Sequence, residues 1–451
     1  MAFLDPTYTK RLFQLALPVM LTQVGQISVN LFDNIIVGNL LGADALASVA
    51  LANSIFFSIF VVALGFSLAI PPLVSEAQTQ QDHQRINSVF SHGLVINIAI
   101  GLLLVGLIFA ISPMLYHMNQ PTHILPDAEI YLKIAVIGII PFMFFQTMRE
   151  VSEGLSFTIG VTKATVIANI LNIILDYIFI KGMGFIPAMG VAGSAYATLL
   201  ARIFMMIFLF FVMKNNPITR RYIQDFSLKI EVFRKEMFAH LLRLGFPMAM
   251  QMFFEVTAFA GAAFICGLVS AKDIAAHQIA LSMASVTFNL CIGFSVASTI
   301  MVGNRVGEKN FLAVKNVGKN NLKIAFMFML MCGLGFILGR HILPTFFTKP
   351  HETEVIALAS QLLIIASLFQ LSDGVQVTAL GLLRGLQDVK IPSFITFIAY
   401  WVITIPLGYF LCITMEMGAF GMWIALGLGL TISALFLVRR FFLKINRRIA
   451  E

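Results

Sequence analysis

The chain has 451 residues, of which 59% are hydrophobic and only 12% charged, and its mean hydropathy is +0.90. A soluble domain carries about twice that charged fraction, so composition excludes a water-soluble globular protein. The net charge of +8 does not indicate nucleic-acid binding. Membrane proteins concentrate Lys and Arg in loops on one side of the bilayer, and a basic total follows from that.

Apolar runs of about 20 residues or more follow one another along nearly the whole chain, and each is long enough for a helix to cross a bilayer. They predict an all-α polytopic membrane protein with twelve transmembrane helices. The first run has no signal-peptide cleavage pattern and is too long for the apolar core of such a peptide, so we expect it to remain a helix. The expected spans are 11–38, 46–73, 88–112, 128–149, 160–181, 190–213, 241–268, 276–304, 316–341, 355–380, 390–412 and 418–440.

An internal repeat divides these spans into two halves. GFSLA (65–69) recurs as GFSVA (293–297), and LFQLALP (12–18) is similar to LLRLGFP (241–247). Six spans separate the copies, so both halves have the same orientation, as in parallel-repeat transporters with a binding site between the halves. The predicted domains are an N-terminal six-helix bundle (1–213), a cytoplasmic linker (214–240) and a C-terminal six-helix bundle with a short cytoplasmic tail (241–451).

Most of the 30 Lys and Arg residues fall on the side of the membrane that holds both termini. Basic loops stay in the cytoplasm, so we expect both termini there. An even number of spans agrees with this orientation.

The sequence contains no motif of a hydrolase or an ATPase, since GxxxxGK[ST], GxSxG and HExxH are all absent. The four cysteines lie in expected spans without a CxxC partner, which is typical of small core residues. His277, the one histidine close to an apolar run, is expected to be structural. We therefore predict neither an enzyme nor a bound cofactor.

Four acidic residues interrupt the apolar spans, namely Asp33, Asp176, Glu255 and Asp373. A charge at the bilayer centre costs at least ~2.5–3.5 kcal/mol, so such residues usually face a cavity and mark an ion path. No Lys or Arg is adjacent to these acids in the spans except Arg202, and one arginine cannot neutralise four acids. The acids are therefore predicted to couple transport to a cation or a proton.

The acids are divided equally between the halves. Asn172 precedes Asp176 by four residues, so both project from one helix face and can present an amide oxygen and a carboxylate to one cation or proton. Glu255 and Asp373 are expected to converge in the second half. Their oxygens can hold either a proton or a sodium ion, so this chemistry leaves the coupling ion open.

Other residues of the spans are expected to shape a pathway. Pro18 and Pro247 lie in the first span of each half, where a proline removes a backbone hydrogen bond and permits a kink. Apolar side chains near Glu255 suit an adaptable cavity. The residues expected to line a substrate cavity are Asp33, Met252, Phe259, Gln278 and Phe369.

These stretches resemble the multidrug and toxic compound extrusion (MATE) family, particularly its NorM-type branch. The resemblance covers essentially the whole chain and is carried by LRLGFPMAMQMFFEVT, AAHQIAL and FQLSDGVQV…LRGLQD. It implies a V-shaped pair of six-helix bundles that exports lipophilic organic cations, including drugs, in exchange for Na⁺ or H⁺ by alternating access. It also implies that Glu255 and Asp373 form the cation site of the second half, and that Asp33 handles protons or substrate in the first.

Two departures from the family pattern affect the coupling ion. NorM-type members can carry Tyr one turn before the second-half aspartate, where this chain has Phe369, so one possible sodium ligand is missing. The pairing of Asn172 with Asp176 is similar to that of other branches. Acidic sites are thus expected in both halves, with ion choice and stoichiometry open.

The leading prediction is a monomeric, multi-pass antiporter of the bacterial inner membrane, with organic cations, Na⁺ or H⁺ and the lipid bilayer as its partners. A flippase for lipid-linked precursors is one alternative, but it would need cationic residues to meet a pyrophosphate, and the charge in the spans is mainly acidic. An intramembrane enzyme with paired aspartates is another. Duplicated halves with separate buried acids disfavour a passive channel.

Overall fold

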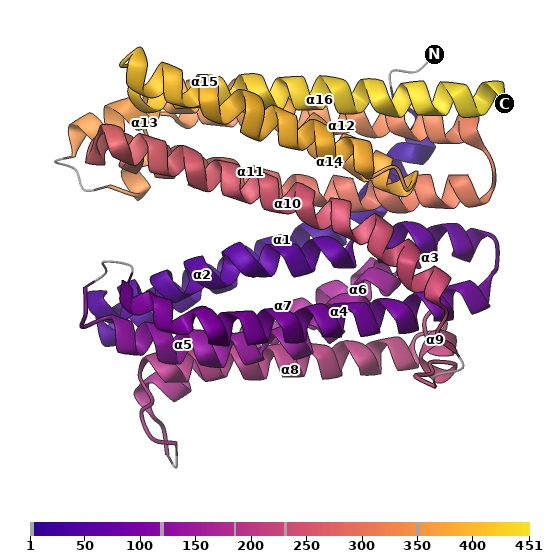
Figure 1. The fold of residues 1–451 in the computed structure, drawn as a ribbon, viewed down its shortest axis with the longest axis horizontal. Helices are drawn as coiled ribbons and strands as arrows, with labels where there is room; N and C mark the ends of the chain where they lie inside the picture. Colours follow the sequence, from indigo (N-terminus) through magenta and orange to yellow (C-terminus); the bar gives the residue numbers. More distant parts are fainter. Residues whose placement is uncertain (1–3, 118–120, 185, 230–231, 349–351) are drawn as a thin grey trace. The chain divides into compact units, whose positions relative to one another are not determined.

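The computed structural model describes residues 4–117, 121–184, 186–229, 232–348 and 352–451. These residues contain 12 helices that are long and apolar enough to cross a membrane, which confirms the predicted all-α class (Figure 1). The short α9 (Arg220–Gln224) lies in the predicted linker. The spans are α1 (Pro6–Leu41), α2 with α3 (Ala43–Ser67, Ile70–Thr79), α4 (His83–Ile111), α5 with α6 (Leu125–Ile137, Ile139–Gly154), α7 (Thr158–Lys181), α8 (Val191–Asn215), α10 (Lys235–Val269), α11 (Ala271–Gly307), α12 (Phe311–Gly339), α13 (Thr353–Gly385), the span from α14 through α15 (Lys390–Thr414) and α16 (Gly418–Ala450).

The chain forms two compact units. Unit 1 comprises Met1–Met20 and Met250–Glu451, and unit 2 comprises Leu21–Ala249. Two helices therefore belong partly to each unit: α1 passes from unit 1 to unit 2 just after Pro18, and α10 passes from unit 2 to unit 1 just after Pro247. The predicted domain limits at 213 and 241, which follow the sequence repeat, stay a prediction.

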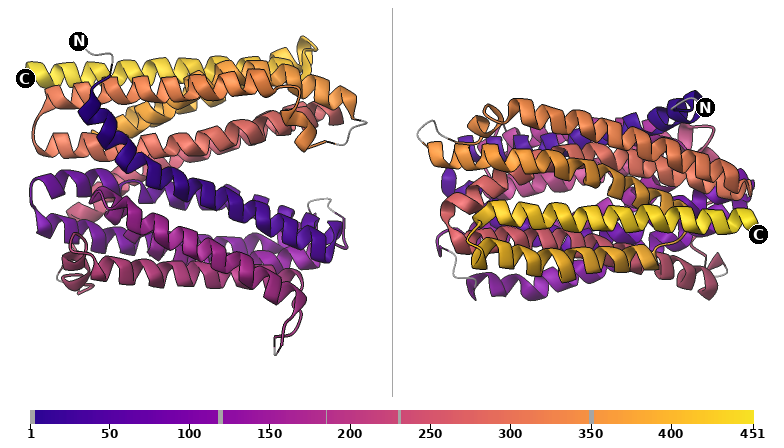
Figure 2. Two further views of the ribbon diagram at one scale, coloured as in Figure 1. Left: turned by 180° about the vertical axis from the view of Figure 1, so that it is seen from behind. Right: turned by 90° about the horizontal axis from the view of Figure 1, so that it is seen from above.

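The beginning of α1 is part of the core of unit 1. Leu12 is fully buried in one apolar cluster with Phe294 of α11 and Phe441 of α16. The backbone N–H of Asp5 donates to Asn320 Oδ1 of α12 at 3.0 Å. Figure 2 shows this indigo segment alongside the helices of unit 1, with both chain ends at the same end of that unit.

The internal repeat is visible in matching helix caps. Gln81 and Lys309 both adopt a positive φ, at 57° and 56°. The next residues, Asp82 and Asn310, each accept a hydrogen bond from the backbone N–H three positions later and so cap α4 and α12. Side-chain caps of this kind satisfy a backbone donor that the first helical turn leaves free. The two halves therefore begin corresponding helices with the same local geometry.

A glycine allows close contact between α11 and α13. A Cβ atom at Gly381 would lie 2.3 Å from the carbonyl oxygen of Ser295. Two hydrogen bonds cross the same contact: Ser295 Oγ donates to the Val377 carbonyl at 2.8 Å, and Thr299 Oγ1 donates to the Gly381 carbonyl at 2.9 Å. Small residues commonly permit such approach between membrane helices.

We expect Gly381→Ala to lower the unfolding temperature of the detergent-purified protein. The added methyl group must push the two backbones apart, and overpacking of this kind costs about 1–3 kcal/mol. The matched control is Gly427→Ala in α16, where a Cβ atom would meet nothing within 4 Å. That variant should unfold at or above the wild-type temperature because alanine favours a helix. Equal unfolding temperatures for both variants would contradict the importance of the contact.

Candidate functional site: buried acids in each unit

In unit 2 the structure brings Asp33 of α1 against Asp176 of α7. Both are buried, with exposed fractions of 8% and 0%. Their carboxyl groups are close enough to interact, and Asp33 Oδ1 and both carboxyl oxygens of Asp176 have no hydrogen-bond partner within the described residues. Two carboxylates in contact repel one another, so an arrangement of this kind shares a proton or surrounds a cation.

Asn172 lies one turn before Asp176 on α7, as the sequence spacing predicts, and is also buried. Neither its Oδ1 nor its Nδ2 atom has a hydrogen-bond partner within the described residues. Buried amides nearly always have partners, from protein or ordered water. The unsatisfied amide beside two acids therefore fits a site that a cation or a water molecule completes.

Arg202 of α8 lies in the same region but forms no ion pair with either acid in the described part of the chain. Its guanidinium group donates to the Ala135 carbonyl at 3.1 Å and lies over the rings of Phe56 and Phe142, at 5.0 and 5.7 Å from their centroids. It interacts with Asp33 only through the longer-range field. The arginine is thus held by a carbonyl and two aromatic faces, which leaves the acid pair available to another cation.

In unit 1 the predicted partners Glu255 and Asp373 lie in one cluster built by α10 and α13. Tyr400 Oη donates to Glu255 Oε1 at 3.3 Å, and Gln376 Nε2 donates to the same oxygen at 3.4 Å. Gln376 and Tyr400 also bond to each other, at 3.0 Å. Asp373 lies three residues before Gln376 on α13, is 3% exposed and interacts electrostatically with Glu255. Glu255 Oε1 thus accepts from an amide and a hydroxyl group, with a second carboxyl group close enough to interact with it.

Sequence reasoning missed Tyr400 because the eleventh span is irregular. It consists of α14 (Lys390–Phe397), a π-helical stretch (Ile398–Thr404), α15 (Ile405–Tyr409) and a second π-helical stretch (Phe410–Thr414). Wide turns of this kind occur frequently at functional sites. The neighbouring Trp401 donates from Nε1 to the Phe254 carbonyl at 3.2 Å. Pro406, which has no backbone N–H, is the one sequence signal that could have indicated the irregularity.

Arg384, which lies outside the span expected to end at residue 380, belongs to the same helix as Asp373. Helix α13 continues past residue 380 to Gly385, so Arg384 lies in its last turn. There Arg384 Nη2 donates to Gln251 Oε1 at 3.3 Å and interacts electrostatically with Glu255. The helix therefore continues beyond the apolar run, and hydropathy alone does not detect this extension.

Two of the expected cavity residues pack beside the unit 1 cluster. The ring of Phe259 meets that of Phe369 edge-on at 6.2 Å and lies 6.0 Å from the ring of Tyr400. Phe369 is 4% exposed and also packs against Trp423, at 5.5 Å. It therefore contributes an apolar wall one turn from Asp373.

The other expected cavity residues in unit 1 are placed differently. Met252 is half-buried on α10, one turn before Glu255. Gln278 is exposed on α11, and none of its described contacts joins it to the acid cluster. The structure thus groups Phe259 and Phe369 with the acids and places Gln278 apart from them.

The described residues form 12 candidate membrane spans that carry acids in their interior, an arrangement typical of an α-helical membrane transporter. The family model described as MatE matches residues 18–178 and 247–410, one segment in each half of the repeat. The chain is 32% identical to a probable multidrug resistance protein NorM of Agrobacterium fabrum, over 98% of this chain and 95% of that protein. It is 32% identical to the multidrug resistance protein MdtK of Pectobacterium atrosepticum, over 96% and 95% of the respective chains. The chain belongs to the MatE family, and it is a transporter rather than an enzyme.

Solved structures show the same fold. The crystal structure of the eukaryotic MATE transporter AtDTX14 is similar with a TM-score of 0.87 and 19% identity, over 97% of this chain and 99% of that one. A crystal structure of MATE in complex with MaL6 is similar with a TM-score of 0.88 and 21% identity, over 98% of both chains. The helical architecture is thus shared at low sequence identity.

Proposed function

We propose that the protein is a secondary active antiporter that exports lipophilic or cationic organic compounds in exchange for Na⁺ or H⁺, by alternating access between its two lobes. The observation that carries the proposal is a pair of acids within each unit, Asp33 with Asp176 and Glu255 with Asp373, of which Glu255 is half-buried and the other three are buried. The names of the relatives, multidrug resistance proteins, support the class of exported compound.

The unit 2 pair suits cyclic loading and release of a cation. A proton or a sodium ion between Asp33 and Asp176 cancels their repulsion, and Asn172 offers a further oxygen that has no described partner. When the ion leaves, the repulsion returns, so the empty and loaded sites favour different local arrangements. Such a difference is what couples ion binding to a conformational change.

The unit 1 cluster offers a similar exchange with more fixed partners. Tyr400 and Gln376 hold Glu255, and Arg384 adds a positive field. Phe369 stands where NorM-type members can carry a tyrosine, and Tyr400 supplies a hydroxyl oxygen near the acids in its place. The oxygens present therefore suit sodium as well as a proton, and the coupling ion stays open in this proposal.

The available driving force is sufficient for export. One elementary charge moving through 100 mV contributes about 2.3 kcal/mol, which supports a concentration ratio of roughly 50-fold for the exported compound. We retain a monomer of the inner membrane with both termini cytoplasmic as the predicted setting. The acidic sites suit lipophilic cations better than lipid pyrophosphates.

The proposal is tested with purified protein in proteoliposomes, using ethidium as a lipophilic cation. We expect an imposed sodium gradient, a pH gradient or both to drive ethidium against its concentration gradient, because the acids exchange the coupling ion for the organic cation. Each gradient is imposed separately, and protein-free liposomes serve as the control. Ethidium movement that neither gradient accelerates would contradict antiport, and equally fast movement without any gradient would indicate a passive channel.

A further inference from the structure

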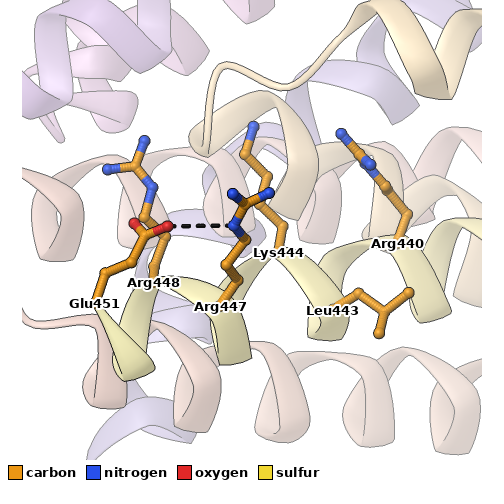
Figure 3. Close-up of a pocket in the computed structure, with 6 residues that line it drawn as sticks. All are labelled: Arg440, Leu443, Lys444, Arg447, Arg448 and Glu451. Carbon is orange, nitrogen blue, oxygen red and sulfur yellow. Dashed lines mark hydrogen bonds and ion pairs between the residues drawn. The ribbon is translucent and has the colours of Figure 1, made fainter.

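The last turns of α16 carry a cationic pocket that the acid sites do not use. Figure 3 shows its four basic side chains rising from the same side of the helix, with a leucine beside them. The pocket is open and has a volume of about 750 Å³. It is lined by Arg440, Leu443, Lys444, Arg447, Arg448 and Glu451.

The basic side chains of this pocket outnumber the acidic side chains that pair with them. Asp388 accepts from Arg440 at 2.8 Å and pairs with Lys444 at 3.3 Å, so one carboxylate serves two cations. Glu451 pairs with Arg447 at 3.2 Å, and the Arg447 side chain is still 84% exposed. Like charges three or four residues apart on a helix repel one another. The pocket therefore favours an added anion.

An apolar track leads to the same pocket. Phe436, Arg440, Leu443 and Arg447 follow a helical spacing that places them on one face of α16. Phe436 and Leu443 are 52% and 57% exposed. Large apolar side chains avoid water, so this face of α16 suits contact with the apolar chains of a lipid. A ligand that fits both features has an anionic head and an apolar tail.

The length of α16 sets the level of this pocket in a bilayer. The helix has 33 residues, so it is about 50 Å long, against ~30 Å for the hydrocarbon core and ~40–45 Å with the headgroups. If Gly418 lies at one edge of the core, Arg440 lies about 33 Å along the helix and Arg447 about 44 Å. Arg440 then lies in the headgroup layer of the opposite edge. Arg447 lies about 14 Å past the core, and only its side chain, which tilts back toward the N-terminus of the helix, reaches toward this layer.

We propose that this pocket binds the phosphate group of an anionic phospholipid, with an acyl chain along Leu443 and Phe436. The phosphate adds the negative charge that Asp388 and Glu451 do not supply. Bound lipid lowers the repulsion along α16 and so stabilises the end of unit 1. The inference does not depend on the ion or the compound that the protein transports.

The test uses detergent-purified full-length protein and dihexanoylphosphatidylglycerol as the anionic probe. The test variant Arg447→Gln/Arg448→Gln leaves both contacts of Asp388 in place. Its matched control, Arg220→Gln/Arg221→Gln, removes two exposed charges from α9 in unit 2. Binding is measured by thermophoresis, and folding is checked by the unfolding temperature. We expect the dissociation constant to rise roughly 30-fold in the test variant, because two basic contacts to the anionic lipid are lost. In the control it should rise less than about twofold.

Two further probes identify the ligand. Dihexanoylphosphatidylcholine, which has the same tails and no net charge, should bind much more weakly than the glycerol lipid. Inorganic phosphate at the same concentration should neither bind measurably nor compete. The proposal is overturned if both double variants weaken binding equally, if phosphatidylcholine binds as tightly, or if inorganic phosphate alone occupies the site. If the test variant unfolds, Arg448→Gln alone replaces it. We expect this single variant to bind the lipid several-fold more weakly, and unchanged binding would contradict the proposal.

Discussion

Replacing Glu255 by Gln or Asp373 by Asn is expected to abolish drug efflux while leaving the amount of protein in the membrane unchanged. Each substitution keeps the size of the side chain and removes its ability to exchange a cation, so the voltage and ion gradients no longer drive export. One charge moving through 100 mV contributes about 2.3 kcal/mol and supports a roughly 50-fold concentration ratio of the drug across the membrane. In these variants that ratio should fall toward one. Efflux of ethidium from loaded cells and immunoblotting of membranes measure the two quantities.

The matched control for these substitutions is Glu354→Gln. Glu354 lies in the first turn of α13, the helix that carries Asp373, but its side chain is 81% exposed and paired with Lys272. Surface ion pairs contribute little to stability, so this variant should transport and accumulate like the wild type. Wild-type efflux from either Glu255→Gln or Asp373→Asn would remove these two residues from the proposed coupling site.

Replacing Asp33 or Asp176 by Asn should slow efflux by about tenfold or more, an effect of at least about 1.4 kcal/mol on the transport cycle. The reason is that either substitution leaves a single acid, so loading an ion no longer relieves repulsion within the pair. Asp127→Asn is the control in the same unit, since Asp127 is exposed in the first turn of α5. Rates are measured in proteoliposomes with equal protein content.

The double variant Asp33→Asn/Asp176→Asn separates the contributions of the two units. If both units couple ions, the double variant resembles the single variants, because removal of either acid already disables the pair. Full efflux from all three variants, together with inactive Glu255→Gln, would show that only the acids of unit 1 drive transport.

The twelve spans were predictable because long apolar runs have few alternatives to a membrane helix, and the intramembrane acids were visible as exceptions within those runs. The neutral polar partners of these acids were harder to foresee. Tyr400 and Gln376 reach Glu255 across 145 and 121 positions of sequence, and neutral polar residues in a span give little indication of their partners. The repeat suggested that the two halves would carry similar sites, but it did not predict the π-helical turns around Tyr400.

Helix interruptions and ends were the least predictable features. The second and fourth spans were expected as single runs, yet α2 ends at Ser67 before α3 begins at Ile70, and α5 ends at Ile137 before α6. The residues at the breaks themselves, LGFSLAI (64–70) and VIGII (136–140), are mostly apolar, so hydropathy does not mark where one helix ends and the next begins. Pro71 and Pro72 after the first break were the only direct signal, since proline favours the first turn of a helix.

The place of the first α1 residues in unit 1 has a consequence for biosynthesis. Asp5 bonds to Asn320, which the ribosome adds 315 residues later, and Leu12 packs against Phe294 and Phe441. At roughly 5–20 residues per second, the beginning of α1 waits about 15 to 60 s for Asn320. During that interval the whole of unit 2 is translated. A gene cut between the two sequence halves would therefore leave Leu12 on one polypeptide and its packing partners on the other, so the second fragment alone could not complete the core of unit 1.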